Sequence, residues 1–283
     1  MSTRLDHARQ LYARLLTSQS ANPRLERAFE LVPREAFLPP GPWDIYAGSG
    51  GRYVETPSAD PIHLYQNVLV ALDADKHINN GEPQLHANWI GAVDPEPGEM
   101  VSHIGSGTGY YTALLSVMTS PGGRVLAYEM EPALAKAARG YLTPFEGIEV
   151  IEGDATRLAL EPSDIIYVNA GLAAPPPHWL KALKPGGRMI FPWRPSLEIG
   201  TAALVTRHET GFAVRIGGGA YFIPCSGAVQ AGEALRTPSR AEAKTIRSIW
   251  ITAERAPDDS AVAVYPEVWF SSKSLSDGAG GGT

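Results

Sequence analysis

The chain has 283 residues, of which 44% are hydrophobic and 19% are charged, and its formal net charge is −6. This length and composition can bury one large core or two modest ones, as in a globular protein. The acidic balance argues against a nucleic acid or an anionic membrane as a partner, since both attract clustered lysine and arginine. Charged side chains at Arg4, Asp6, Arg9 and Arg14 interrupt the N-terminal segment, so it predicts neither a signal peptide nor a membrane span. A cytoplasmic location is therefore expected.

Metal and disulfide chemistry has no support in the sequence. Cys225 is the single cysteine, which excludes an intrachain disulfide and a cysteine-based metal cluster. The seven histidines form no HxH or HxxxH pair, so we expect no metal site.

The first third of the chain predicts helices and an ordered loop. Apolar residues at helical spacing predict amphipathic helices over residues 3–16 and 23–32, the second of them capped by Asn22. The segment 39–61 is rich in proline, glycine and serine and contains aromatic residues, which favours a loop held by aromatic contacts. A further helix is expected over residues 84–93.

From Met100 onward, short apolar runs alternate with helical ones. The strand-like runs are MVSHI, RVLAYE, IEVIE, DIIYVNA and RMIFPW, and the helical runs between them are YYTALLSVM, PALAKAARGYL and PPHWLKAL. This alternation predicts an α/β fold, a Rossmann-like and mainly parallel sheet covered on both faces. The runs TAALVTR, GFAVRI and AYFIPC then predict antiparallel edge strands.

The predicted organisation has four parts. Residues 1–96 form a helical N-terminal cap with an acceptor-loop region, and residues 97–228 form the Rossmann-like domain. Residues 229–270 form a C-terminal extension with a helix around 239–247 and strands near 248–254 and 261–270. The low-complexity end, 271–283, is expected to be disordered.

A glycine-rich loop, GSGTG, joins the first predicted strand of this domain to its helix. Gly105, Gly107 and Gly109 allow the backbone to turn sharply and to approach a ligand, toward which the helix directs its first amides. The dinucleotide fingerprint GxGxxG requires glycine where this chain has Tyr110. A nucleotide-dependent oxidoreductase is therefore the less favoured alternative.

Polar residues follow the next three strands. Glu129 stands 20 residues after Gly109, where a carboxylate can accept hydrogen bonds from a ribose diol. Asp154, within Gly153-Asp154-Ala155, follows the third strand, where an acidic side chain can meet an adenine edge, and Asn169 ends the fourth strand. The carboxyl ends of these strands together predict a site shaped for adenosine.

At this point the sequence resembles the class I S-adenosylmethionine-dependent methyltransferases and, within them, the protein-L-isoaspartate O-methyltransferase family. The resemblance extends over roughly residues 20–228. It is carried by LVPREAFLPP (31–40), VSHIGSGTGYYTALLS (101–116), AYEMEPALAKAAR (127–139), GDA (153–155), DIIYVNAGLAAPPPHWLKALKPGGRMIFPW (164–193) and YFIPCSGA (221–228). It implies S-adenosyl-L-methionine as cofactor and a carboxylate of a protein or peptide as methyl acceptor.

The resemblance also implies the cofactor contacts. In the family an acidic residue two positions before the loop contacts the methionine part of the cofactor, whereas this chain has His103, which can still form a hydrogen bond. The expected cofactor-binding residues are His103, Gly105, Ser106, Gly107, Gly109, Glu129, Met130, Asp154, Ala155 and Asn169.

The acceptor segment departs from the family pattern. The family has Thr-Ile-Ser-x-Pro, and the corresponding stretch here is Asn79-Asn80-Gly81-Glu82-Pro83, so the expected serine aligns with Gly81. We expect Asn79 and Asn80 to act as catalytic amide donors, and Gly81, Pro83 and His86 to bind substrate. The plain alternative is that NNG is only a turn. A changed acceptor, such as a small molecule or modified peptide, and a catalytically inactive cofactor-binding adaptor are further alternatives.

Overall fold

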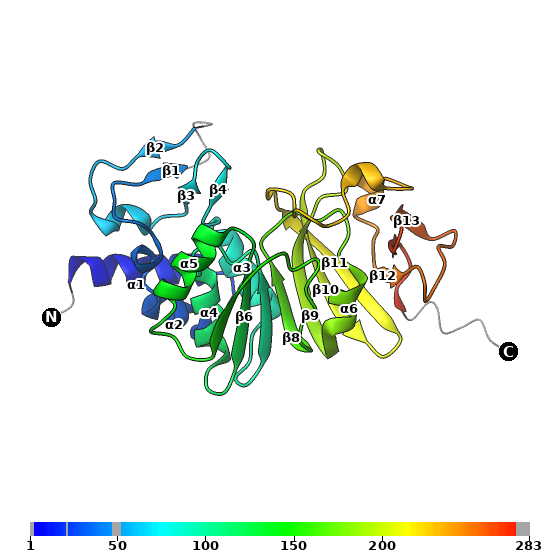
Figure 1. Cartoon of the computed structure of the whole chain (residues 1–283), viewed down its shortest axis with the longest axis horizontal. Coiled ribbons are helices and arrows are strands. Elements are labelled where there is room, and N and C mark those ends of the chain that lie inside the picture. The colour runs from blue at the N-terminus through cyan, green and yellow to red at the C-terminus, as the bar shows by residue number, and fades with distance from the viewer. Residues whose placement is uncertain (1–2, 21, 47–51, 276–283) are drawn as a thin grey trace. The chain divides into compact units, whose positions relative to one another are not determined.

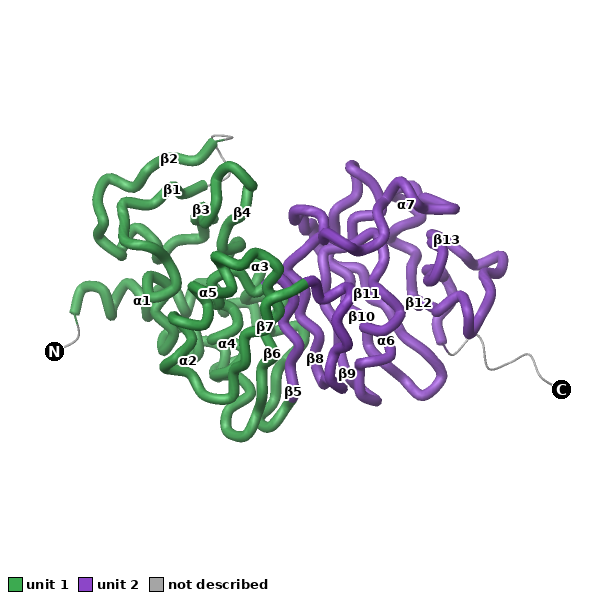
Figure 2. Tube along the Cα trace, viewed as in Figure 1, with its two compact units in different colours: residues 1–99, 106–153 green, residues 100–105, 154–283 purple. Residues whose placement is uncertain are grey.

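The computed structural model describes residues 3–20, 22–46 and 52–275 (Figure 1). The chain forms two compact units (Figure 2). Unit 1 comprises residues 1–99 and 106–153, and unit 2 comprises residues 100–105 and 154–283. The predicted divisions at residues 97 and 229 stay predictions.

Side-chain caps mark the starts of the first two helices of unit 1, and Asn22 is the cap that the sequence predicted. In α1 (Arg4–Thr17) the Thr3 and Asp6 side chains form a reciprocal capping box, and in α2 (Pro23–Leu31) the Asn22 side chain accepts from two backbone N–H groups. Both helices contact α3 (Pro83–Val93), and α2 also contacts α4 (Tyr110–Thr119). The predicted N-terminal helices and the helix over 84–93 are therefore confirmed.

Unit 1 also contains a βαβ unit and a small antiparallel sheet. Strands β6 (Arg124–Glu129) and β7 (Ile148–Glu152) pair in parallel and are joined by α5 (Pro132–Tyr141). The small sheet has the order β2-β1-β3-β4. Its strands are β1 (Asp44–Tyr46), β2 (Val54–Glu55), β3 (Leu69–Asp73) and β4 (Ile78–Asn79), and the 3-10 helices Arg34–Phe37 and Pro61–Leu64 flank it.

Aromatic contacts hold the proline-rich segment, as predicted. Trp43 is buried with Leu64 and Val70, and its indole N–H donates to the carbonyl of Pro39 at 2.8 Å. The segment forms β1 and β2 as well as loop, and residues 47–51 of it lie outside the described residues.

Unit 2 is built on a sheet whose strand order is β13-β14-β12-β11-β10-β9-β8-β5. Strand β8 pairs in parallel with both β5 and β9, and all the other pairs are antiparallel. The strands are β5 (Met100–Ile104), β8 (Ser163–Val168), β9 (Leu183–Trp193), β10 (Thr201–His208), β11 (Gly211–Gly219), β12 (Ser248–Ile251), β13 (Ala261–Val264) and β14 (Val268–Ser271). The short helices are α6 (Pro177–Ala182), the 3-10 turn Ala231–Glu233 and α7 (Arg240–Ala243). The predicted α/β class, with parallel strands extended by antiparallel ones, is confirmed.

Two local predictions in unit 2 were wrong, and one predicted helix is shorter than expected. Residues 220–225 form no strand and make only an isolated bridge between Pro224 and Gly171. The expected strand over 261–270 is two antiparallel strands separated at Pro266, because proline has no N–H to donate to a ladder. The helix around 239–247 is a single turn, α7.

The predicted disordered end is described only in part. Ser271 is the last residue of β14, and residues 276–283 lie outside the described residues.

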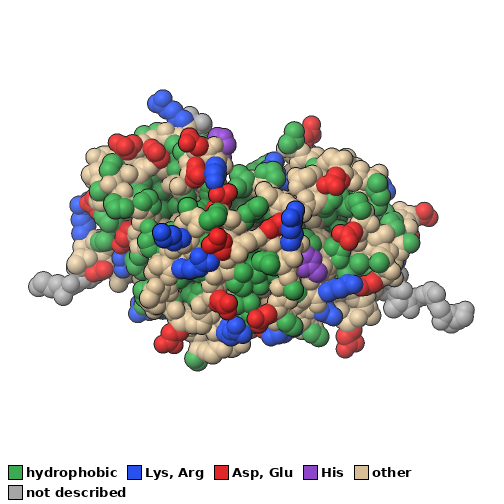
Figure 3. Space-filling model, in the orientation of Figure 1, with side chains coloured by type: hydrophobic (Ala, Val, Ile, Leu, Met, Phe, Trp, Pro, Cys, Tyr) green, Lys and Arg blue, Asp and Glu red, His purple; other side chains and the backbone are tan. Residues whose placement is uncertain are grey.

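On the face in Figure 3, lysine and arginine side chains are scattered among acidic and apolar ones. Within the described part of the chain, no helix combines the length and apolarity that a bilayer crossing needs, and no three His, Cys, Asp or Glu residues are grouped to hold a metal ion.

Candidate functional site

The glycine loop of unit 1 has a backbone that only glycine adopts readily. Gly107 and Gly109 have φ values of +57° and +98°. A Cβ atom on Gly109 would lie 2.8 Å from Leu142, and this glycine is the N-cap of α4. The N–H of Ser106 donates to the carbonyl of Tyr128 at 3.1 Å, which attaches the loop to β6. The loop is therefore a fixed turn that starts a buried helix.

Glu129 contacts this loop, and its hydrogen bonds to a ribose diol stay a prediction. The side chain is 7% exposed, and its Oε2 accepts from the N–H of Gly107 at 2.7 Å while Oε1 accepts from the N–H of Glu131 at 2.9 Å. Burial raises the pKa of Glu129, and hydrogen bonds from the N–H groups of Glu131, Gly107 and Met130 oppose that rise. A carboxylate has about four acceptor positions. Three backbone donors therefore orient the carboxylate and leave capacity for a ligand hydroxyl.

Ser106 adds a second polar group to the loop. Its side chain is 5% exposed, and within the described residues its buried Oγ has no hydrogen-bond partner. A buried hydroxyl without a partner costs about 1–3 kcal/mol. A polar ligand against the loop would remove that cost.

In unit 2, His103 and Asn169 are brought together. The Asn169 side-chain amide donates to His103 Nε2 at 2.8 Å, and His103 is fully buried. Burial lowers the pKa of His103 to about 3, so the imidazole is neutral at physiological pH. Gly105 has a φ of +73°, and a Cβ atom there would lie 3.5 Å from the Asn169 backbone. These three predicted cofactor residues therefore form one cluster.

Asp154 is held at the start of the loop after β7. Its Oδ1 accepts from both the N–H and the hydroxyl of Thr156, at 2.9 and 2.7 Å. A Cβ atom on Gly227 would lie 2.6 Å from Asp154 Oδ2, so only glycine allows this approach. The neighbouring Ala155 is buried, and its carbonyl accepts from the indole of Trp179 at 3.1 Å. The sequence did not single out Gly227, although its φ of +83° is the kind of position that favours glycine.

The predicted acceptor segment is an ordered turn. Asn79 Oδ1 accepts from the N–H of Gly81 at 2.9 Å. Asn80 is 8% exposed, and its Oδ1 accepts from Arg34 at 2.9 Å and from the N–H of Val70 at 3.0 Å. Both side-chain oxygens therefore stabilise the turn, as the plain interpretation of NNG expects. The catalytic role of the two amides stays a prediction.

Arg34 organises the same region, and sequence reasoning used it only as part of a motif. It is fully buried and donates to the carbonyls of Leu64, Gln66 and Val68 at 2.8, 3.3 and 2.6 Å, in addition to Asn80. A guanidinium offers five donors in a rigid fork, which suits several carbonyl oxygens at once. The available sequence signal was an arginine, next to Glu35, within the mostly apolar run LVPREAFLPP.

Gly81 and His86, both predicted substrate residues, lie in contact with Tyr111. A Cβ atom on Gly81 would lie 2.4 Å from His86 Nε2 and 3.1 Å from Tyr111. The His86 and Tyr111 rings stack with centroids 3.6 Å apart, and the Tyr111 hydroxyl donates to the carbonyl of Gly81 at 3.2 Å. Pro83 is buried at the first position of α3. His86 therefore fills the space that a side chain at position 81 would need.

Comparison with solved structures supports the fold. One structure of a protein-L-isoaspartate O-methyltransferase superposes on 93% of this chain and 86% of its own, with a TM-score of 0.68 and 19% identity. A Plasmodium falciparum protein in complex with S-adenosyl-L-homocysteine superposes on 77% of this chain and 98% of its own, with a TM-score of 0.60 and 14% identity.

Comparison with known sequences identifies the family. A protein-L-isoaspartate O-methyltransferase of Aeropyrum pernix is 35% identical over 182 residues, which are 62% of each chain. One of Methanopyrus kandleri is 32% identical over 210 residues, which are 72% of this chain and 84% of the relative. The model of the protein-L-isoaspartate(D-aspartate) O-methyltransferase family matches residues 9–230. This chain belongs to that family.

Proposed function

We propose that this protein transfers a methyl group from S-adenosyl-L-methionine to a carboxylate of a protein or peptide, with isoaspartyl residues as the acceptors. The observation that carries the proposal is the Glu129 carboxylate, which the N–H of Gly107 holds against the glycine loop at 2.7 Å. The match to the protein-L-isoaspartate(D-aspartate) O-methyltransferase family supports methyl transfer to a carboxylate as the reaction.

The residues of the loop fit this cofactor. Glu129 retains acceptor capacity for a ribose diol, and the Ser106 hydroxyl is buried without a partner within the described residues. When bound, the cofactor supplies a methyl group on a positively charged sulfur. His103, which replaces an acidic residue of the family, is neutral and so places no like charge against a sulfonium. Met130, Asp154, Ala155 and Asn169 stay predicted cofactor contacts.

The acceptor needs no strong general base, because a carboxylate is already an anion at neutral pH. The protein has to align the acceptor oxygen with the methyl carbon and to exclude water, and alignment of this kind is worth on the order of 7–11 kcal/mol. An ordered acceptor segment meets the first requirement. Its turn is fixed by Asn79 and Asn80 and clamped by Arg34. A missing serine at position 81 is therefore compatible with turnover.

The test is to supply an isoaspartyl peptide with labelled cofactor and to measure base-labile methyl ester. We expect the wild type to form the ester and Glu129→Ala to lose this activity. The control Glu149→Ala, on the exposed part of β7, should keep it. Cofactor binding without ester would support the altered-acceptor or adaptor alternative. No binding of the cofactor at all would contradict the proposal. A cytoplasmic location remains a prediction from the sequence.

A further inference from the structure

The β3–β4 hairpin of unit 1 contacts both segments that hold Glu129. A Cβ atom on Gly107 would lie 3.6 Å from Leu72 Cδ1, so the Leu72 side chain lies against the glycine loop. At the tip of the hairpin, the Lys76 ammonium donates to the carboxylate of Glu131 and forms an ion pair with it. The hairpin therefore contacts the loop after β5 and the residues after β6.

These two contacts flank the Glu129 carboxylate. The N–H of Gly107 donates to its Oε2 at 2.7 Å, and the N–H of Glu131 donates to its Oε1 at 2.9 Å. The two residues that the hairpin contacts are thus the same two that orient Glu129. Because Glu129 is only 7% exposed, a ligand as large as a nucleoside reaches its free acceptor positions only if a covering segment moves.

The base of the hairpin is fixed, whereas its tip is exposed. Val70 at the base is fully buried, and its N–H donates to Asn80 Oδ1, which also accepts from Arg34. Residues 74–77 at the tip are exposed, and β4 spans no more than Ile78–Asn79. Segments with few buried contacts open most easily, so the tip is the part of the hairpin that can move.

We propose that the β3–β4 hairpin is a flap over the cofactor-binding carboxylate and that the Lys76–Glu131 ion pair latches it. The proposal rests on the proposed function, which makes S-adenosyl-L-methionine the ligand of Glu129. Lys76 is a positioning residue, since it acts through Glu131. The side chains of Lys76 and Glu131 are 53% and 34% exposed, and an exposed pair contributes little free energy. The latch therefore slows the opening of the flap by a small factor.

The first experiment measures cofactor exchange and needs no methyl transfer. Radiolabelled S-adenosyl-L-methionine is bound to the full chain and chased with unlabelled cofactor, and its association is followed separately. Because the flap must open for both entry and release, Lys76→Met should raise the association and dissociation rate constants together by about twofold to fivefold, with Kd changed by less than about twofold. Glu131→Gln should act like Lys76→Met, and Lys76→Arg, which keeps the charge, should act like the wild type.

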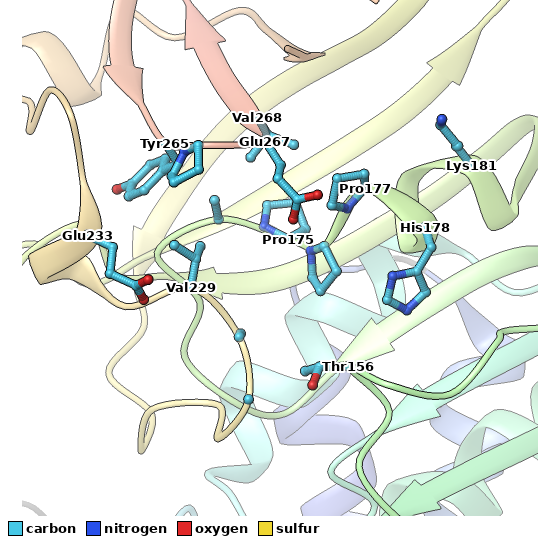
Figure 4. A pocket seen from close by; sticks show the side chains of 15 residues that line it. Thr156, Pro175, Pro177, His178, Lys181, Val229, Glu233, Tyr265, Glu267 and Val268 are labelled. Atoms are coloured by element: carbon cyan, nitrogen blue, oxygen red, sulfur yellow. The ribbon is translucent and has the colours of Figure 1, made fainter. Parts of the chain in front are cut away.

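A matched control breaks an exposed ion pair in unit 2. Lys181, which lines a hollow of that unit (Figure 4), is 59% exposed and pairs with Glu254 at 3.2 Å. Lys181→Met should leave both rate constants unchanged. A rise in dissociation alone would make Lys76 an ordinary binding contact, and unchanged rate constants in Lys76→Met would exclude a latch. Either result overturns the proposal.

Hydrogen exchange separates this inference from the proposed function. In the cofactor-free protein, backbone amides of residues 71–79 should exchange about twofold to fivefold faster in Lys76→Met than in the wild type, while those of α2 should not change. Faster exchange in a protein that binds no S-adenosyl-L-methionine would refute the proposed function and leave the latch. Cofactor binding with unchanged exchange and unchanged rate constants would refute the flap alone.

Discussion

Restoring serine at position 81 is expected to damage this protein. Gly81 has a φ of +76°, a conformation that costs a side-chain-bearing residue about 1–2 kcal/mol. The new Cβ atom would lie 2.4 Å from His86 Nε2, and overpacking a filled site costs about 1–3 kcal/mol more. The free energy of unfolding of Gly81→Ser should therefore fall by about 2–5 kcal/mol, as measured by urea unfolding followed by circular dichroism.

Two matched variants separate these causes. Gly98 has a φ of +84°, and no atom lies within 4 Å of its Cβ position, so Gly98→Ser should show the backbone cost alone. Adding His86→Ala to Gly81→Ser removes the ring that causes the clash, so the two changes together should cost less than the sum of their separate effects, by about 1–3 kcal/mol. The reasoning fails if Gly81→Ser is no less stable than Gly98→Ser.

Three further outcomes are expected. The pKa of His103 is lowered to about 3, below its unfolded value near 6.5, so protonation favours the unfolded chain, and the free energy of unfolding should fall by about 2 kcal/mol between pH 7 and pH 5. Urea unfolding of His103→Gln should lack this loss, and an equal loss in the variant would refute the assignment. Glu129→Gln should weaken S-adenosyl-L-methionine binding by about tenfold to a hundredfold in calorimetry, because its amide nitrogen cannot accept hydrogen bonds; an unchanged affinity would count against the site. Arg34→Met should lower the free energy of unfolding by about 3–5 kcal/mol, because buried carbonyl groups lose their hydrogen-bond donor. Arg139→Met, which breaks an exposed ion pair with Glu152, should lower it by under about 1 kcal/mol, and equal losses would contradict the structural role of Arg34.

The sequence by itself determined the features that depend on neighbours along the chain. Asn22 caps α2 through N–H groups two and three residues away, and Gly107 and Gly109 impose the loop through their own backbone angles. The position of Glu129 at the end of β6 follows from a single βα repeat. Such signals need only a few residues to act, so the α/β class was predicted correctly, whereas the roles of the glycine loop and Glu129 in binding the cofactor stay predictions.

Only the tertiary structure decided the features that depend on distant neighbours. Arg34 clamps carbonyl groups 30 and more residues later, and Gly227 is required because Asp154 lies against it. The space at Gly81 is filled by His86 and Tyr111, so a position that the family pattern marks as serine has no room for it. Each of these features depends on the space between packed side chains and on hydrogen-bond partners from distant segments. The spacing of residues along the sequence does not specify either of them.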